Sequence, residues 1–89
     1  MTETRTINLL DIYLAGFLSL HGIEPKLELN NGRVAFTFPA EDEVYRLMNL
    51  FNGNVNVPVA DFVTTVKTLR GKMLTAKENG DIDNGKRKF

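Results

Sequence analysis

The sequence predicts a small α+β domain in which an antiparallel β-hairpin packs on one side of three helices. Two alternating runs, Lys26–Asn30 and Arg33–Phe38, flank the pair Asn31-Gly32. Asn-Gly between alternating runs is the strongest short-range signal for a hairpin, because both turn residues need a positive φ. One segment with apolar residues at helical spacing precedes the hairpin, and two such segments follow it. Since an isolated hairpin is only marginally stable, helices must cover its apolar face, and the expected order is α-β-β-α-(β)-α.

The composition indicates one globular unit. The chain has 89 residues, 43% of them hydrophobic, and its 11 basic and 11 acidic residues give a formal net charge of zero. These values exclude disorder throughout, which requires low hydrophobicity and a high net charge. We expect one globular domain over residues 7–75. Residues 76–89 are polar and glycine-containing, and we expect them to form a disordered tail.

The chain contains no cysteine, which excludes disulfides, thiolate catalysis and cysteine-ligated metal sites. A cysteine-free chain also suits the reducing cytoplasm. The longest apolar stretch, Leu9–Leu20, is interrupted by Asp11 and is far shorter than the ~20 residues that span a bilayer. The polar start, Met1–Arg5, does not resemble a signal peptide. We therefore expect a cytoplasmic protein that does not associate with membranes.

The first helix is predicted over Ile12–His21. Asp11 precedes it as an N-cap residue, and Gly22 follows it as a left-handed stop. Its apolar residues cover most of its circumference, so it is expected to be a central helix that is covered on more than one side. Gly16 lies on the remaining arc and permits close approach of another backbone. Residues 1–6 are polar, and we expect them to be frayed.

The register of the hairpin follows from a two-residue turn. That turn pairs Asn30 with Arg33, Leu29 with Val34, and Leu27 with Phe36. The large apolar residues then share one face of the hairpin, and Lys26, Glu28 and Thr37 lie on the other.

After Pro39, the acidic run Glu41–Glu43 begins a second helix that ends near Asn52-Gly53. Val55–Val57 is a possible short third strand, and Pro58 fits the start of a third helix. The apolar stripe of that helix comprises Val59, Phe62, Val63, Val66, Leu69 and Met73.

The run Asp11-Ile12-Tyr13-Leu14-Ala15-Gly16-Phe17-Leu18, followed by Gly22, carries a family resemblance. It resembles the opening motif of a family of small bacterial and phage domains of unknown function, which reads Asp, aliphatic, Tyr, Leu, Ala, any residue, Phe, Leu, and ends in Gly. The strand Val34–Phe38 and the final helix, with Phe62 and Leu69, also look like that family's pattern. The resemblance covers about Leu9 to Met73. It supports the fold and implies no catalytic or ligand-binding residues.

No residue pattern points to an enzyme, a cofactor or a bound metal. His21 is the only histidine, and its place at a helix end favours capping or packing over general-base catalysis. Asp81–Gly85 superficially resembles a calcium loop, but no frame places both the glycine and the final glutamate of an EF-hand. The acidic run Glu41–Glu43 is sufficiently explained by the helix dipole.

The preferred functional hypothesis is a non-enzymatic protein–protein interaction module that self-associates, for example as a homodimer. A small core, exposed sheet edges and opposite charge poles on one body motivate it. Tyr45 and Leu50 are the candidate interaction residues, because apolar residues near them are expected to stay exposed. Leu50 is the best single anchor, since it lies away from the main apolar stripe of the second helix, which comprises Val44, Leu47, Met48 and Phe51.

The alternative hypothesis is a nucleic-acid-binding accessory protein of phage or mobile-element origin. Residues 62–77 contain four basic residues and no acidic ones, and the candidate phosphate contacts are Lys67, Arg70, Lys72 and Lys77. Lys67 and Arg70 flank the apolar stripe on one side, and Lys72 lies on the other. Basic residues late in a helix also favour the dipole, and a net charge of zero is unusual for a dedicated nucleic-acid binder of this size.

Overall fold

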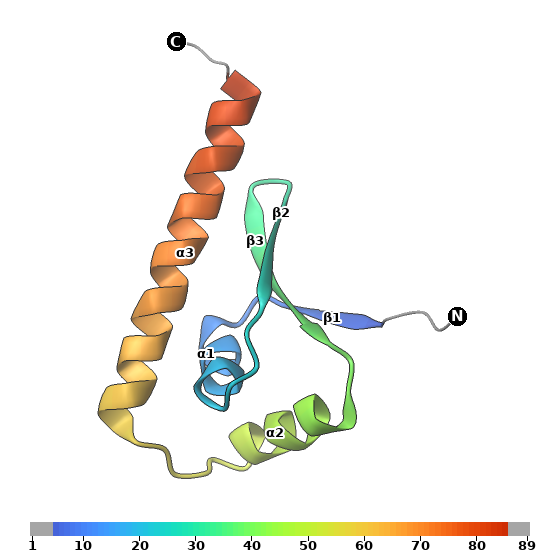
Figure 1. Ribbon diagram of the computed structural model, residues 1–89, viewed down its shortest axis with the longest axis vertical. Helices are drawn as coiled ribbons and strands as arrows, with labels where there is room; N and C mark the ends of the chain where they lie inside the picture. The colour runs from blue at the N-terminus through green and yellow to red at the C-terminus, as the bar shows by residue number, and fades with distance from the viewer. Residues whose placement is uncertain (1–4, 86–89) are drawn as a thin grey trace.

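Three helices pack against one face of a three-stranded antiparallel sheet in a computed structural model that describes the backbone of residues 5–85 and the side chains of residues 5–79 (Figure 1). The elements in chain order are β1 (Thr6–Leu9), α1 (Ile12–Leu20), β2 (Lys26–Asn30), β3 (Arg33–Pro39), α2 (Asp42–Asn52) and α3 (Val59–Gly85). The predicted α+β class is therefore confirmed.

The helix α1 begins at Ile12 as predicted and ends at Leu20, one residue before the predicted end, with His21 as its C-cap. The Asp11 carboxylate accepts hydrogen bonds from the backbone amides of Tyr13 (2.9 Å) and Leu14 (3.3 Å), and Gly22 adopts a left-handed φ of +93°. Five consecutive residues, Leu14–Leu18, are buried. Figure 1 shows α1 between α2 and α3, as expected of a central helix.

The hairpin of β2 and β3 also has the predicted geometry. Asn31 and Gly32 both have positive φ, at 54° and 81°. The pairs Asn30–Arg33, Leu29–Val34 and Leu27–Phe36 are formed as the two-residue turn requires.

The third strand lies at the N-terminus and not at Val55–Val57. Residues 55–58 form part of the connection between α2 and α3 and belong to no strand. The strand β1 instead pairs with β3, with Ile7 opposite Phe38 and Leu9 opposite Phe36, so the strand order is β1-β3-β2. The expected fraying of residues 1–6 is wrong at Thr6, which begins β1, and at Arg5, whose carbonyl accepts a hydrogen bond from the Ala40 amide (2.9 Å). Residues 1–4 lie outside the described part.

Both faces of the central strand β3 are buried, since five consecutive residues, Val34–Phe38, are buried. Thr37 lies on the face away from the helices, as predicted, yet only 6% of it is exposed. Its hydroxyl donates a hydrogen bond to the side-chain oxygen of Asn8 on β1 (2.9 Å). The strand β1 thus supplies a hydrogen-bond partner for the Thr37 hydroxyl, whose burial without a partner would destabilise the fold.

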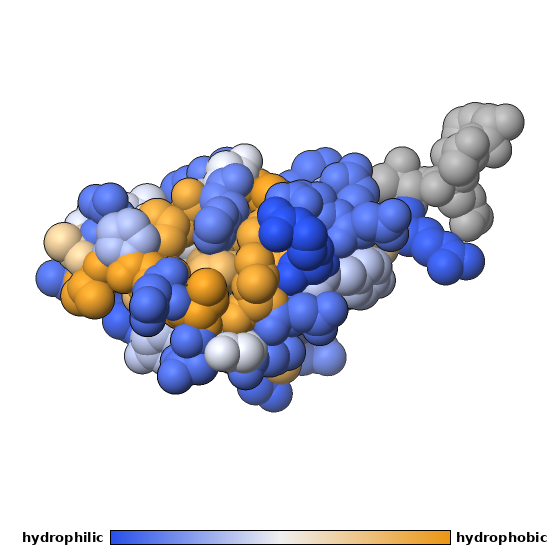
Figure 2. All heavy atoms as spheres, turned by 90° about the horizontal axis from the view of Figure 1, so that it is seen from below, coloured by the Kyte–Doolittle hydropathy of each residue, from blue (hydrophilic) through white to orange (hydrophobic). Residues whose placement is uncertain are grey.

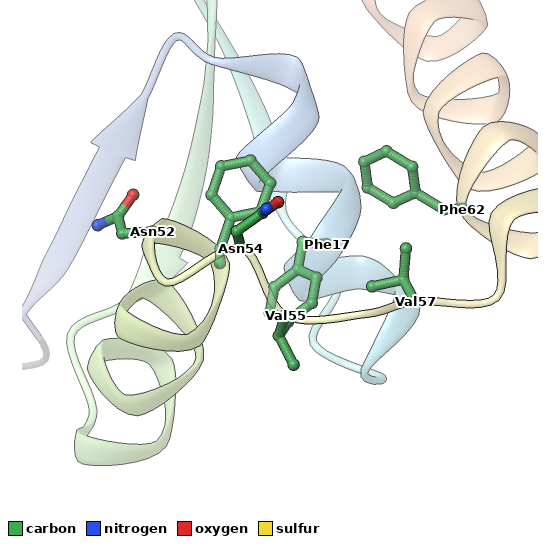
Figure 3. A pocket seen from close by; sticks show the side chains of 7 residues that line it. Phe17, Asn52, Asn54, Val55, Val57 and Phe62 are labelled. Atoms are coloured by element: carbon green, nitrogen blue, oxygen red, sulfur yellow. The ribbon is translucent and has the colours of Figure 1, made fainter.

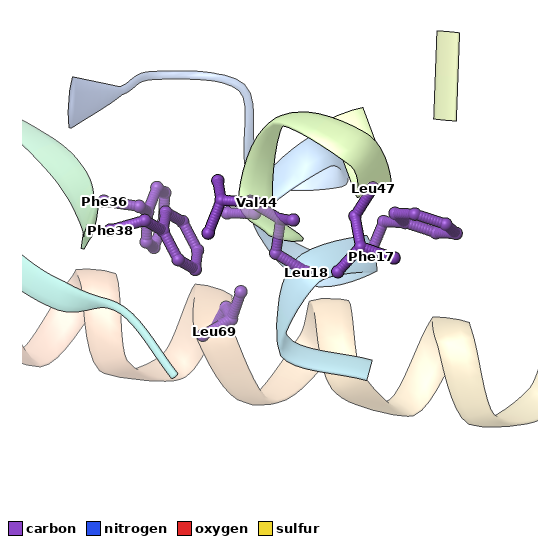
Figure 4. Close-up of a cluster of buried hydrophobic side chains, with 8 residues drawn as sticks. Phe17, Leu18, Phe36, Phe38, Val44, Leu47 and Leu69 are labelled. Carbon is purple, nitrogen blue, oxygen red and sulfur yellow. The ribbon is translucent and has the colours of Figure 1, made fainter. Parts of the chain in front are cut away.

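The core joins all three helices to β3 (Figure 4). Its buried members are Ala15, Phe17, Leu18, Phe36, Phe38, Val44, Leu47 and Leu69. Gly16 faces α3 so closely that a Cβ atom at this position would lie 2.7 Å from Cγ2 of Val66. The close approach predicted at Gly16 is therefore the contact between α1 and α3.

The third helix differs from expectation in two ways. Val59 and Val63 are 71% and 43% exposed, whereas both were expected in the buried stripe. Val63 lies about 100° around the helix from Phe62, so it falls outside the strip that faces α1 and the sheet. The helix also continues to Gly85, where a disordered tail was expected from residue 76, and residues 86–89 lie outside the described part.

Candidate interaction surface

A shallow groove of about 170 Å³ runs between α1 and α3, and we call it the α1–α3 groove. It is lined by Tyr13, Phe62, Val63, Val66, Lys67 and Arg70. Val66 forms a buried floor, whereas Tyr13 and Val63 are 52% and 43% exposed. The groove combines exposed apolar and aromatic side chains with two cations at its edge.

The position of Tyr13 follows from the packing of α1. Gly16 faces α3, and Tyr13 precedes it by three residues, which places both on the same side of the helix. The Tyr13 ring therefore lies against α3 beside Val63, one turn from the closest contact of the two helices. The apolar pattern of the first helix predicts that Tyr13 is buried with its neighbours. The polar hydroxyl of Tyr13 was the one signal of its exposure, since a tyrosine side chain often keeps its hydroxyl end in water.

A larger pocket of about 450 Å³ adjoins the groove (Figure 3). It lies among α1, the end of α2, the following loop and the start of α3, and is lined by Phe17, Phe51, Asn52, Asn54, Val55, Val57 and Phe62. Phe62 lines both hollows, so the two hollows adjoin at this residue. Figure 2 shows apolar side chains gathered on the face where α2, this loop and α3 meet.

The four candidate phosphate contacts do not share one site. Lys67 and Arg70 lie together at the α1–α3 groove. Lys72 lines a separate hollow with Ser19 and Glu24, and Lys77 is half-buried further along α3. The basic surface is therefore divided between two sides of the helix.

The candidate residues of α2 also lie apart. Tyr45 is 46% exposed and Leu50 is 37% exposed. Five residues of an α-helix turn through about 140° beyond one full turn, so the two side chains face different directions. Leu50 lies at the end of α2, where its carbonyl accepts hydrogen bonds from the amides of Gly53 and Val55.

The beginning of α2 carries three acidic residues in different situations. The Glu43 carboxylate accepts two hydrogen bonds from the Arg46 guanidinium, at 2.9 and 2.7 Å. This contact is the one ion pair among the side chains of residues 5–79, so Glu41 and Asp42 carry unpaired charges there. Both precede or begin α2, where negative charge interacts favourably with the helix dipole.

The pKa of Glu43 is expected to lie below its ordinary value, first because of the hydrogen bond from Arg46 and then because of the Arg46 charge. A carboxyl group with a lowered folded-state pKa contributes stability above its unfolded pKa, and that contribution is lost as pH falls through the folded value. The Glu43–Arg46 pair is exposed to solvent, so we expect its loss on acidification to change the free energy of unfolding very little. NMR titration of the Glu43 side-chain carbonyl should show the lowered pKa, and Arg46→Gln should restore it. An unchanged pKa in that variant would exclude Arg46 as the cause.

His21 has a packing role. Its backbone amide donates to the carbonyls of Phe17 and Leu18 at the end of α1. The imidazole centroid lies 4.6 Å from that of the Phe17 ring. Among the described residues, no three side chains of His, Cys, Asp or Glu gather where they could hold a metal ion. The calcium-like segment Asp81–Gly85 has no described side chains.

None of the helices in the described part of the chain is both long and apolar enough to cross a membrane.

Over residues 5–85 the chain forms a small α+β domain, with three helices on one face of an antiparallel sheet and an exposed groove between α1 and α3. The chain belongs to the family described as Domain of unknown function (DUF5659), which matches residues 4–75. The expectation of a family of unknown function is confirmed. Searches of curated proteins and of solved structures found no significant match.

Proposed function

We propose that this domain is a non-enzymatic protein–protein interaction module that associates with a second copy of itself. The observation that carries the proposal is a pair of exposed hollows, the α1–α3 groove and the larger pocket, which adjoin at Phe62. Tyrosine and arginine are enriched among the residues that dominate binding energy at interfaces, and the groove presents Tyr13 and Arg70. Burying its exposed apolar side chains would add to the stability of a domain with a small core.

The distribution of charge supports a second copy as the partner. Residues 62–77 carry only basic charges, whereas the beginning of α2 carries a cluster of acidic ones. With a net charge of zero, two copies do not repel each other as whole molecules. Opposite poles on each copy also favour mutual orientation at encounter.

Sedimentation velocity over a wide range of protein concentration tests the proposal. We expect the average mass to rise with concentration, and the association to weaken at high salt because the paired charges are screened. The variant Tyr13→Ser should weaken association and keep the fold, because Tyr13 is half exposed. A chain that stays monomeric up to millimolar concentration would overturn the proposed self-association.

Nucleic-acid binding is a second candidate function, favoured by the Tyr13 ring beside Lys67 and Arg70. Cations that hold phosphates next to an aromatic ring that stacks on bases form a common single-strand binding arrangement. The division between Lys67 and Lys72, with Lys77 further along α3, weighs against a broad phosphate surface. Amide NMR titration with a short single strand and a duplex, at low and moderate salt, tests this candidate. Shifts at the groove that disappear with salt would support it, and unchanged spectra at low salt would contradict it.

A further inference from the structure

We propose that the α1–α3 groove receives the beginning of α2 from a second copy of the chain. This inference rests on the proposed self-association and assigns its two contacting surfaces. One surface is the α1–α3 groove, with Lys67 and Arg70 at its edge. The other consists of Glu41, Asp42 and Tyr45, and we call it the acidic α2 face.

The charge of the groove favours an acidic partner. Residues 62–77 contain no acidic residue, and among the described side chains Lys67 and Arg70 take part in no ion pair. Val63, Lys67 and Arg70 follow one another at spacings of four and three residues, so they line one side of α3. This side offers a hydrophobic end at Val63 and a cationic end at Arg70.

The acidic α2 face has the matching chemistry. Glu43 is engaged by Arg46, whereas Glu41 and Asp42 form no ion pair with any side chain of residues 5–79. Tyr45 follows Asp42 by three residues and is 46% exposed, so an anionic end precedes an aromatic one. Together these residues supply both the charge and the apolar area that the groove leaves unmatched.

The order of charged and apolar residues fixes the orientation of the docked helix. On α2 the anionic Asp42 precedes Tyr45, whereas on α3 the apolar Val63 precedes the cationic Arg70. When the acidic end of α2 meets Arg70, Tyr45 reaches the apolar part of the groove only if α2 runs antiparallel to α3.

The contact must form between two molecules. Figure 1 shows α1 between α2 and α3, so a chain's own α2 lies on the opposite side of α1 from its α3. Val44 and Leu47 bury the inner side of α2 in the core, which fixes the helix in that place. The acidic α2 face therefore remains available to a second copy.

Paired charge reversals test the assignment. The variant Lys67→Glu/Arg70→Glu makes the groove acidic, and Glu41→Lys/Asp42→Lys makes the α2 face basic. Each variant alone should raise the dissociation constant of self-association at least about tenfold, because like charges meet at the contact. An equimolar mixture of the two variants should regain association, since every contact between unlike copies is again complementary.

Two controls separate charge and folding effects from the contact itself. The variant Lys26→Glu/Arg33→Glu changes the net charge by the same amount as Lys67→Glu/Arg70→Glu, but it does so on the hairpin. It should associate as the wild type does. Thermal unfolding must show that each variant folds, because lysines at the beginning of α2 oppose its dipole. If Glu41→Lys/Asp42→Lys does not fold, the neutral variant Glu41→Gln/Asp42→Asn replaces it, with weakened association as the expected result. Tyr45→Ala should also weaken association.

The outcomes distinguish this inference from the function on which it rests. A monomeric wild type would overturn the proposed self-association. A wild type that associates while both charge-reversed variants associate equally well, or a mixture that does not recover, would overturn the docking of α2 in the groove. If Lys67→Glu/Arg70→Glu removes binding of a single-stranded oligonucleotide and leaves self-association unchanged, the groove is a nucleic-acid site and the inference is wrong.

Discussion

Phe36→Ala is expected to remove most of the stability of this domain. The Phe36 side chain is fully buried on the central strand β3, between Leu9 of β1 and Leu27 of β2, and it belongs to the core cluster that joins the sheet to the helices. Replacing a buried phenylalanine by alanine costs about 3–5 kcal/mol, because the apolar contacts are lost and a cavity remains. Small domains have total stabilities of roughly 5–15 kcal/mol, so this single change brings the chain close to its unfolding limit. Urea unfolding followed by circular dichroism measures the loss.

Tyr45→Ala is the matched control for this prediction. It also removes an aromatic ring, but the ring is half exposed and lies outside the core. We expect a change of no more than about 0.5 kcal/mol at a protein concentration low enough to keep the chain monomeric. Equal losses in the two variants would contradict the placement of Phe36 at the centre of the core.

The parts of the fold that were predictable have local signals. Asp11 and Gly22 fix the ends of α1 within its own sequence, and Asn31-Gly32 fixes the register of the hairpin. Each signal acts over a few residues through a side-chain cap or a positive φ. No distant partner is needed to decide such features.

The third strand was misplaced because its identity depends on a distant partner. Thr6–Leu9 and Val55–Val57 are both short alternating segments, and only the former lies beside β3. The hydrogen bond between Thr37 and Asn8 spans 29 residues of chain, beyond the reach of any local pattern. Alternation identifies a candidate strand, but the available sheet edge decides which candidate pairs.

The candidate surface was predictable only in part, for a similar reason. Helical spacing placed Lys67 and Arg70 on one side of the third helix, and the groove contains both. The exposure of Tyr13 and Val63 depends on which strip of α3 faces α1, and the contact of Gly16 with Val66 sets that strip. Periodicity alone gives an apolar stripe without saying how much of it the neighbouring helix covers.

Gly16→Val is expected to destabilise the domain by about 2–3 kcal/mol, as measured by urea unfolding. A Cβ atom at this position would lie 2.7 Å from Cγ2 of Val66 and 3.8 Å from the Phe62 ring, so either the buried Val66 side chain must shift or α1 and α3 must move apart. Valine has a higher intrinsic helix propensity than glycine, so propensity alone predicts a gain. Gly71→Val is the matched control, because nothing lies within 4 Å of a Cβ atom there, and we expect no loss of stability.

The cause of the Gly16→Val effect is tested by a double-mutant cycle with Val66→Ala. Val66→Ala alone should destabilise the domain, because Val66 is buried and the substitution leaves a cavity. The double variant adds three carbons at position 16 of α1 and removes two at position 66 of α3, so the side-chain volume at the contact rises by one methyl group and not by a whole valine side chain. We therefore expect it to be more stable than the sum of the two single losses predicts, by about 0.5–3 kcal/mol. Additive losses would mean that the approach of these two helices is not what requires glycine at position 16. The strip of α3 that faces α1, and with it the exposure of Tyr13 and Val63, would then need another determinant.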